Sequence, residues 1–134
     1  MKHFIYSIIL SSLFIFSSCE KDEGKLPNIS FTAGNGNLTA DANVSKGASY
    51  KIAITASKAE DKDVLKKFNV SKSINGATAS TVIDKSLSGA EEDNYYYELS
   101  AIADTIVGQK TKYTFTVTNR DGLTNQVALT ITVQ

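Results

Sequence analysis

The chain has 134 residues with 14 basic and 14 acidic side chains, so its formal net charge at pH 7 is zero. Without a basic excess it has no general electrostatic attraction to nucleic acid, and no nucleic-acid partner is expected. It contains one histidine, one cysteine and no tryptophan, so catalysis by a histidine or a thiol would depend on two positions alone.

The first eighteen residues have the organisation of an export signal. A short positive start is followed by the mostly apolar residues 4 to 16, and the small residues Ser17 and Ser18 then precede Cys19. A membrane-spanning helix requires about 20 consecutive apolar residues, and this stretch is shorter and interrupted by serines. We therefore expect residues 1–18 to be a signal peptide that is removed.

The stretch around Cys19 resembles the lipobox of bacterial lipoproteins, in which a bulky apolar residue and two small ones precede the cysteine that is lipidated. Phe16 occupies the position where leucine is commoner. The resemblance implies that Cys19 becomes the N-terminus and carries fatty acyl chains such as palmitate. The membrane would then be a partner through the N-terminal lipid, because two or more acyl chains hold a protein stably.

The tripeptide Lys21-Asp22-Glu23 follows the candidate lipidation site. It is similar to the signal that sends Bacteroidota-type lipoproteins to the outer face of the outer membrane. The resemblance implies an outer-membrane lipoprotein exposed on the cell surface, and the alternative is a solvated linker in a protein that faces the periplasm. Residues 19–27 as a whole are expected to form the lipidated N-terminus and a linker.

Removal of the signal would leave residues 19 to 134, enough for one domain with a core but not for two. It would also remove His3, the only histidine, and lipidation would consume the only thiol. The mature chain would then lack a Ser-His or Cys-His nucleophile pair, a Cys/His zinc site and a disulfide. We therefore expect a non-enzymatic protein without a cofactor or a metal.

From Asn28 onward the chain consists of short alternating runs separated by turn residues, the pattern of an all-β sandwich. Ile29 and Phe31 begin the first strand, and Val44 is interpreted as the second half of this split strand. The next strand places four apolar side chains on one face, at Tyr50, Ile52, Ile54 and Ala56.

Residues 58 to 68 are charged, and their weak apolar period favours a loop with a turn inside it over one short helical turn. A strand through Phe68, Val70 and Ile74 then ends at Asn75-Gly76, a strong turn signal. A weaker strand covers residues 78 to 87 and closes at Ser88-Gly89.

The stretch DNYYYEL, residues 93 to 99, contains three successive tyrosines, which cannot all face the core of a sandwich. Tyr95 and Tyr97 are expected to share the inner face and Tyr96 the outer one. An exposed tyrosine can stack against a sugar ring, so Tyr96 is a candidate glycan-binding residue. The alternative is ordinary packing on a half-covered face, and the absence of tryptophan argues against a carbohydrate-binding module.

The last two strands are the clearest in the sequence. Tyr113, Phe115 and Val117 alternate with threonines, and NRDG, residues 119 to 122, makes the turn. An apolar run returns at Val127, Leu129, Ile131 and Val133. The two runs predict a hairpin whose buried faces are in register.

About seven strands in residues 28–134 fit an immunoglobulin-like β-sandwich by size and spacing. The segments VSKGASYKIAITA, the NG turn, LSG and above all YTFTVTNRDGLTNQVALTITV resemble the immunoglobulin-like modules of bacterial surface lipoproteins and adhesins, including PKD and cadherin-like repeats. In this resemblance Tyr113, five residues after Gly108, is similar to a tyrosine corner, and the alternative is an ordinary core tyrosine. The resemblance supports the fold more than any function.

Two acidic clusters, at residues 60 to 63 and 91 to 93, are interpreted as solvated loop charge. Glycoside cleavage needs two carboxyl groups facing each other across a sugar, and calcium needs six to eight converging oxygens; consecutive acids on loops provide neither. Asp104-Thr105-Ile106 resembles the motif at which exported proteins of Bacteroidota are O-glycosylated. Thr105 is therefore a candidate modification site, although such a tripeptide is frequent by chance.

The sequence is compatible with three functions. The leading hypothesis is a non-enzymatic, lipid-anchored module of the cell surface that binds or adheres to a protein or polysaccharide ligand. The second is a glycan-capture accessory lipoprotein of an outer-membrane polysaccharide uptake system. The third is a structural subunit of a surface fibre that assembles by strand exchange.

Overall fold

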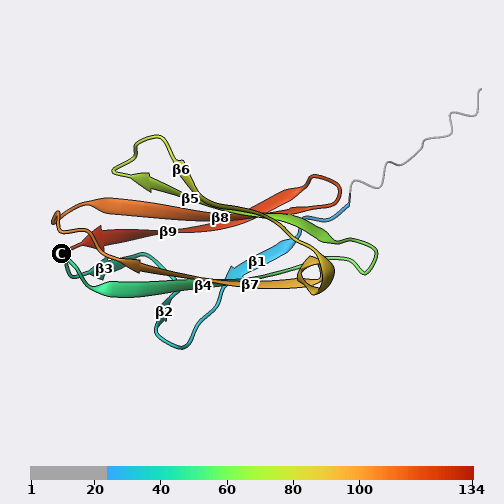
Figure 1. Ribbon diagram of the computed structural model, residues 1–134, viewed down its shortest axis with the longest axis horizontal. Helices are drawn as coiled ribbons and strands as arrows, with labels where there is room; N and C mark the ends of the chain where they lie inside the picture. Colours follow the sequence, from blue (N-terminus) through green and yellow to red (C-terminus); the bar gives the residue numbers. More distant parts are fainter. Residues whose placement is uncertain (1–23) are drawn as a thin grey trace, which may run out of the picture.

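The computed structural model describes residues 24–134 and shows two packed β-sheets (Figure 1), which confirms the all-β prediction. In the first sheet, β4 (Ser49–Ser57) pairs along its whole length with β7 (Asn94–Ile102) on one side. Its other side pairs with two short strands, β1 (Asn28–Phe31) and β2 (Asn37–Leu38).

The second sheet has five strands in the order β3-β9-β8-β5-β6. Their bounds are Ala42–Val44 for β3, Leu65–Ile74 for β5, Ser80–Ser86 for β6, Lys110–Asn119 for β8 and Thr124–Val133 for β9. The chain crosses from β6 back to the first sheet through η1 (Gly89–Glu92), a single 3-10 turn where the sequence predicted only a turn. No helix within residues 24–134 is long and apolar enough to cross a membrane.

The first strand is split between the two sheets, as the sequence predicted. β1 runs antiparallel to β4 in the first sheet, whereas β3 runs parallel to β9 in the second, with Val44 opposite Val133. If β1 and β3 count as one strand, the chain has the seven principal strands that were expected, and the two-residue β2 is an addition that its sequence did not indicate.

The core lies between the sheets and is formed by the alternate apolar residues of each strand. Phe68 and Phe115 are fully buried at its centre, where the ring of Phe115 meets that of Phe31 edge to face at 6.0 Å and Phe68 lies 5.0 Å from Tyr95. Burial of a large aromatic side chain contributes on the order of 2–3 kcal/mol. The predicted hairpin is confirmed, since β8 and β9 pair with their buried faces in register.

Local turn chemistry also follows the sequence. Asn75 and Gly76 both have positive φ, 51° and 77°, as the tight turn after β5 requires, and Gly122 has φ 82° in the turn between β8 and β9. Residues 58 to 64 form the predicted loop. Leu65 and Phe68 have helical spacing in the sequence but do not form a helix. Both residues belong to β5, whose register with β8 is irregular between them.

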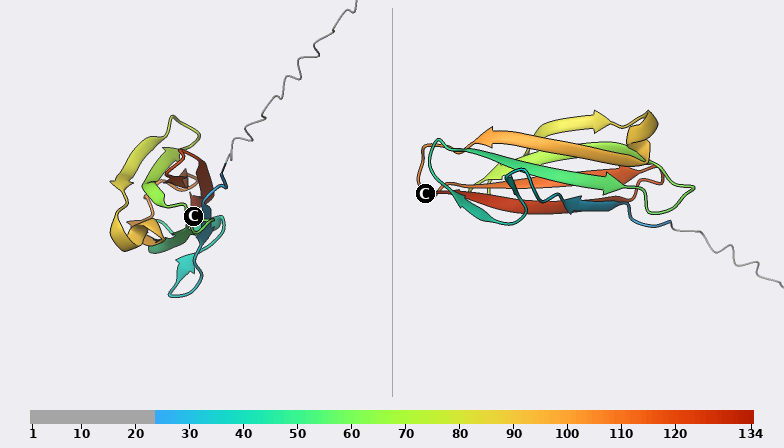
Figure 2. Two further views of the ribbon diagram at one scale, coloured as in Figure 1. Left: turned by 90° about the vertical axis from the view of Figure 1, so that its right-hand side faces the viewer. Right: turned by 90° about the horizontal axis from the view of Figure 1, so that it is seen from below.

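The two ends of the sandwich differ, as Figures 1 and 2 show. The end where residues 24–27 join the domain, together with the loop of residues 58–64 and the turn of residues 119–123, is called the tether end. The opposite end holds the loops of residues 45–48, 75–79 and 103–109 and the C-terminus, and is called the distal end.

The expected linker is partly docked onto the domain. The side-chain amide of Asn119 donates to the carbonyl of Lys25 at 3.1 Å, and that of Asn125 donates to the carbonyl of Pro27 at 2.9 Å. Pro27 is buried. Residues 25–27 are therefore held by the turn between β8 and β9, which shortens any free tether.

Candidate functional site

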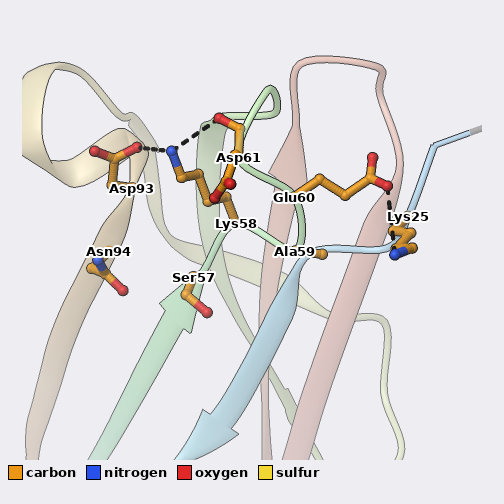
Figure 3. A pocket seen from close by; sticks show the side chains of 8 residues that line it. All are labelled: Lys25, Ser57, Lys58, Ala59, Glu60, Asp61, Asp93 and Asn94. Atoms are coloured by element: carbon orange, nitrogen blue, oxygen red, sulfur yellow. Dashed lines mark hydrogen bonds and ion pairs between the residues drawn. The ribbon is translucent and has the colours of Figure 1, made fainter.

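A hollow of about 480 Å³ lies at the tether end (Figure 3). The end of β4, the loop after it and the start of β7 build its walls. It is lined by Lys25, Ser57, Lys58, Ala59, Glu60, Asp61, Asp93 and Asn94. The fold thus brings the two acidic clusters of the sequence to one place, which spacing along the chain did not indicate.

Four of the charged side chains of this hollow are paired with one another. The ammonium group of Lys58 lies 2.8 Å from the carboxylate of Asp93 and donates to the carbonyl of Asp61 at 3.2 Å, and Lys25 lies 3.6 Å from Glu60. The hydrogen bond to Asp93 raises the pKa of Lys58. An ionic ligand that binds at Lys58 or Glu60 would have to displace these partners.

Two acids of the second cluster that lie outside the hollow are also paired with lysines. Glu91 pairs with Lys85 and Glu92 with Lys66, and the hydrogen bond from Lys85 lowers the pKa of Glu91. Within residues 24–134, no group of three histidine, cysteine, aspartate or glutamate side chains is placed to hold a metal ion.

Asp63 corrects the interpretation of the acids as solvated loop charge. Its side chain is only 2 % exposed, and it accepts hydrogen bonds from the backbone N–H of Val64 at 2.8 Å and from the side-chain amide of Asn119 at 2.7 Å. Asn119 is equally buried, and its carbonyl oxygen accepts from the backbone of Asp121 and Leu123. The pair is a structural clamp of the tether end, because every bond fixes a turn or the incoming chain.

The distal end displays apolar side chains to solvent. Ile106 and Val107, in the loop between β7 and β8, are 60 % and 66 % exposed, and Ile102 at the end of β7 is 70 % exposed. Ile74 at the end of β5 is also exposed on the same end. Because contiguous apolar patches are a common feature of interaction surfaces, the distal end is a candidate contact surface.

The loop that carries these side chains is fixed by hydrogen bonds. The Asp104 carboxylate accepts from the backbone N–H of Thr105 at 2.6 Å and from the side-chain amide of Gln109 at 3.1 Å, and the bond from Thr105 is the main reason why the pKa of Asp104 is lowered. Gly108, with φ 86°, donates its N–H to Val133 at 2.8 Å. The apolar side chains are thus presented by a pre-ordered loop, which limits the entropy lost on binding.

A small hollow of about 110 Å³ opens between the sheets beside this loop. Tyr50 and Tyr113 lie in its wall, with their hydroxyl groups 2.8 Å apart. Burial and this hydrogen bond raise the pKa of Tyr50 well above its usual range. Each hydroxyl carries one proton and one bond uses one proton, so the pair keeps a second O–H for an occupant of the hollow.

This hydroxyl pair also answers the tyrosine-corner hypothesis for Tyr113. Its hydroxyl bonds to Tyr50, on β4 of the other sheet, and no hydrogen bond joins it to the loop backbone within the described part of the chain. Tyr113 therefore ties the two sheets together instead of fixing the corner before β8.

The structure places two of the site residues named from the sequence. Tyr96 is 52 % exposed on the outer face of the first sheet, whereas Tyr95 is buried and Tyr97 largely so, which confirms the expected facing. The Tyr96 hydroxyl donates to Glu98 at 3.2 Å. Thr105 is exposed at the distal end. Cys19, Lys21, Asp22 and Glu23 lie outside the described residues.

Fold and site define a two-sheet β-domain, and comparison with known proteins adds structural neighbours only. No protein-family model matches the chain, and no curated protein matches it. Among solved structures, the domain is similar to a superoxide reductase (neelaredoxin) from Ignicoccus hospitalis, with 9 % identity, a TM-score of 0.50 and coverage of 82 % of this chain and 81 % of the other.

A putative superoxide reductase from Thermotoga maritima matches with 10 % identity and a TM-score of 0.50 over 86 % of this chain and 92 % of the other. The sporulation control protein Spo0M from Bacillus subtilis matches with 6 % identity and a TM-score of 0.51, over 82 % of this chain and 50 % of the other. At such identities the likeness concerns the arrangement of the strands, not the chemistry.

Proposed function

We propose that this protein is a lipid-anchored, non-enzymatic binding or adhesion module of the cell surface. The observation that supports the proposal is the difference between the two ends of the domain. The incoming chain is hydrogen-bonded to the tether end, whereas exposed aliphatic side chains lie on an ordered loop at the distal end.

The anchor end is consistent with attachment through Cys19. Five peptide steps separate Cys19 from Gly24, and at about 3.3–3.6 Å per residue they span at most roughly 18 Å. Ten-residue strands extend about 33 Å, so an upright domain would carry its distal end well clear of the lipid headgroups. The distal loop is then the part that meets another molecule first.

The immunoglobulin-like class is part of the same proposal. The first sheet has the order β1-β4-β7 and the second contains β9-β8-β5-β6, which corresponds to strands A-B-E against G-F-C-C′ of immunoglobulin domains. The turn η1 stands where strand D would be. Loops and sheet faces, not a central cleft, carry the binding specificity of this class.

The absence of enzymatic activity is proposed on the chemistry of the side chains. Residues 24–134 contain no histidine and no cysteine. At the tether end Glu60 and Asp93 are paired with lysines, and Asp63 is bonded to the buried amide of Asn119. A general acid needs a carboxyl group held protonated, and the acids with shifted pKa values here, Glu91, Glu98 and Asp104, are all shifted downward.

Two comparisons test the proposal on cells. Cys19→Ala should move the protein from the detergent phase to the aqueous phase in a phase-partition experiment, and an unchanged distribution would contradict the anchor. A photo-crosslinking amino acid at Ile106 should give a defined crosslinked product on intact cells, whereas the same group at Gln126, exposed on β9 of the second sheet, should not. Equal crosslinking at both positions would contradict binding through the distal end.

A second candidate function, glycan capture, is favoured by the outer face of the first sheet. There Tyr96 is half exposed, and Glu98, held by Lys51 at 3.0 Å and by the Tyr96 hydroxyl, offers a carboxylate beside the ring. Retardation of the protein in gels that contain polysaccharide, lost on Tyr96→Ala, would support this function. No retardation across a broad panel of polysaccharides would argue against it.

The third candidate, a surface-fibre subunit, depends on the edges of the sheets. Within the described residues β7 has no strand on its outer side, so an incoming strand has a place to pair.

A further inference from the structure

β7 is an open edge whose backbone groups are available for pairing. Two backbone hydrogen bonds show which residues of β7 bond to β4. The backbone N–H of Lys58 donates to the carbonyl of Asp93, and the backbone N–H of Ala103 donates to the carbonyl of Ala48. In an antiparallel ladder the residues that bond to the partner alternate with residues whose N–H and C=O point away. The even-numbered residues of β7, from Asn94 to Ile102, therefore direct their backbone groups outward.

The other edges of the two sheets are protected, and β7 is the exception. β1, β2 and β3 have only four, two and three residues. β6 carries the charged pair Asp84 and Lys85 and shows a register irregularity against β5. Short length, charge and irregularity are the usual means of blocking edge pairing. β7 has nine residues in unbroken register, without proline or lysine.

The side chains of β7 fit a second copy of the same strand. Self-pairing centred on Leu99 places Tyr96 opposite Ile102 of the second copy, twice in each dimer, and these are the two exposed apolar side chains of β7. Aromatic and β-branched side chains form favourable cross-strand pairs. On the inner face the same register sets the large Tyr97 opposite the small Ala101.

Charge distinguishes this register from its neighbour. Centring on Leu99 sets Glu98 opposite Ser100, whereas centring on Glu98 would set two carboxylates directly opposite each other, which is destabilising. Glu98 is also held by Lys51 within its own copy. The whole chain has no net charge, so two copies do not repel each other at long range.

We propose that two copies of this protein pair through β7, antiparallel and centred on Leu99, to form one continuous sheet across a homodimer. The two-fold relation uses the same edge of both copies, so the assembly closes and does not extend into a fibre. The paired stretch from Tyr96 to Ile102 spans about 23 Å. An interface of this size is small, and the dimer is a reversible one of roughly micromolar affinity.

Antiparallel pairing also sets the two tether ends at opposite ends of the dimer (Figure 1). Upright copies anchored in the same membrane cannot adopt this arrangement, whereas copies on two facing cells can. This part rests on the proposed function, and it makes the protein a homophilic contact between cells.

Pairing is tested in solution with the full chain carrying Cys19→Ala, by sedimentation equilibrium from about 1 to 100 µM. A monomer–dimer equilibrium is expected. Because the Ser100 N–H points away from β4, Ser100→Pro should abolish the dimer while circular dichroism and the melting temperature stay close to those of Ser100→Ala, which should remain dimeric. A monomer at every concentration, or a Ser100→Pro dimer, would overturn the proposal.

The register is tested at the same position by a matched pair of charged variants. Ser100→Lys faces Glu98 of the second copy and should tighten the dimer, and Ser100→Glu should weaken it, with a difference in Kd of about tenfold because each dimer contains two such pairs. Equal affinities of the two variants would overturn the register centred on Leu99.

The cell contact is tested with two dye-labelled populations that display the anchored protein. Mixed clumps are expected, and populations that carry Ser100→Pro should stay dispersed. A dimer in solution with no difference between these populations would overturn the contact between cells and leave the pairing in place. If the Cys19→Ala protein stayed in the membrane, this result would count against the proposed lipid anchor alone. The measurement of pairing in solution does not depend on the anchor.

Discussion

At the scale of single residues, the buried polar groups have structural roles. Asn119 uses both ends of its amide: it donates to Asp63 and to the carbonyl of Lys25 and accepts from two backbone N–H groups of the following turn. The asparagine of NRDG was predicted only as a turn residue. Its partner Asp63 lies 56 positions away along the chain, so no local signal could indicate the clamp.

Asn119→Ala should lower the free energy of unfolding by about 2–4 kcal/mol, because the buried Asp63 carboxylate keeps only its bond from the Val64 backbone, and three backbone groups lose the Asn119 amide as a partner. Asn125→Ala, which loses the bond to Pro27 on the same side of the domain, should cost only about 1 kcal/mol. Urea unfolding followed by circular dichroism measures both. Equal losses would show that the Asp63 contact adds nothing.

The hydroxyl pair of Tyr50 and Tyr113 predicts sensitivity to alkali. The pKa of Tyr50 is raised in the folded state, whereas an unfolded tyrosine ionises near about pH 10. Above that pH the unfolded chain loses the proton first, so stability is complete below about pH 10 and falls as the pH rises further. The raised pKa values of Lys58, Lys85 and Tyr97 act in the same direction.

Unfolding free energies measured from about pH 8 to 11 should therefore decline above about pH 10, and the decline should be shallower in Tyr50→Phe. Tyr96→Phe, which changes an exposed ring, is the matched control and should keep the slope of the unchanged protein. A Tyr50→Phe protein with that same slope would contradict this assignment.

At the scale of elements, the strands could be predicted from the sequence. Which strands lie at the sheet edges, and which of these edges are protected from pairing, could not be predicted. Alternation identified β4, β7, β8 and β9 with nearly the observed limits, because one face of each strand packs on the core. β2 and η1 were missed: two residues carry no period, and η1 has no buried residue. The acidic loops met at one hollow because of strand order, which spacing does not encode. The exposed loop at Ile106 and Val107 was visible as a break between strands, but not as a surface.

No disulfide can join the sheets within residues 24–134, which contain no cysteine, so packing holds them together beside the Tyr50–Tyr113 hydrogen bond. Phe115→Ala on β8 should therefore cost about 3–5 kcal/mol, through lost burial and a cavity beside Phe31. Thr114→Ala, on the outer face of the same strand, should cost less than about 1 kcal/mol. Thermal and urea unfolding of both variants decides this, and similar losses would mean that the core near Phe115 collapses without a cavity.

At the scale of the whole molecule, the tether end and the distal end lie at opposite ends of the domain. The side of the membrane on which the domain is displayed therefore decides which reagents can reach the distal end. Lys46 lies in the loop of residues 45–48, exposed at the distal end, where Gly47 donates to the carbonyl of Ala103. A reagent outside the cell reaches this loop only if the domain is displayed outward.

Lys46→Cys should accordingly be labelled by a membrane-impermeant maleimide on intact cells, since lipidation of Cys19 leaves no competing thiol in the proposed mature protein. The unchanged protein, treated in the same way, should remain unlabelled. Labelling of Lys46→Cys only after the outer membrane has been opened would place the domain in the periplasm.

The clamp at the tether end has a mechanical consequence. A pull on the lipid reaches the domain through Lys25 to Pro27, so the bonds from Asn119 and Asn125 carry the load before β1 can peel away from β4. When the opposing force acts at the distal end or along β7, tension runs parallel to the strands. Ladder hydrogen bonds lie across that direction, so they are sheared together instead of being unzipped one by one. A reversible contact of modest affinity would therefore detach before the domain that carries it unfolds.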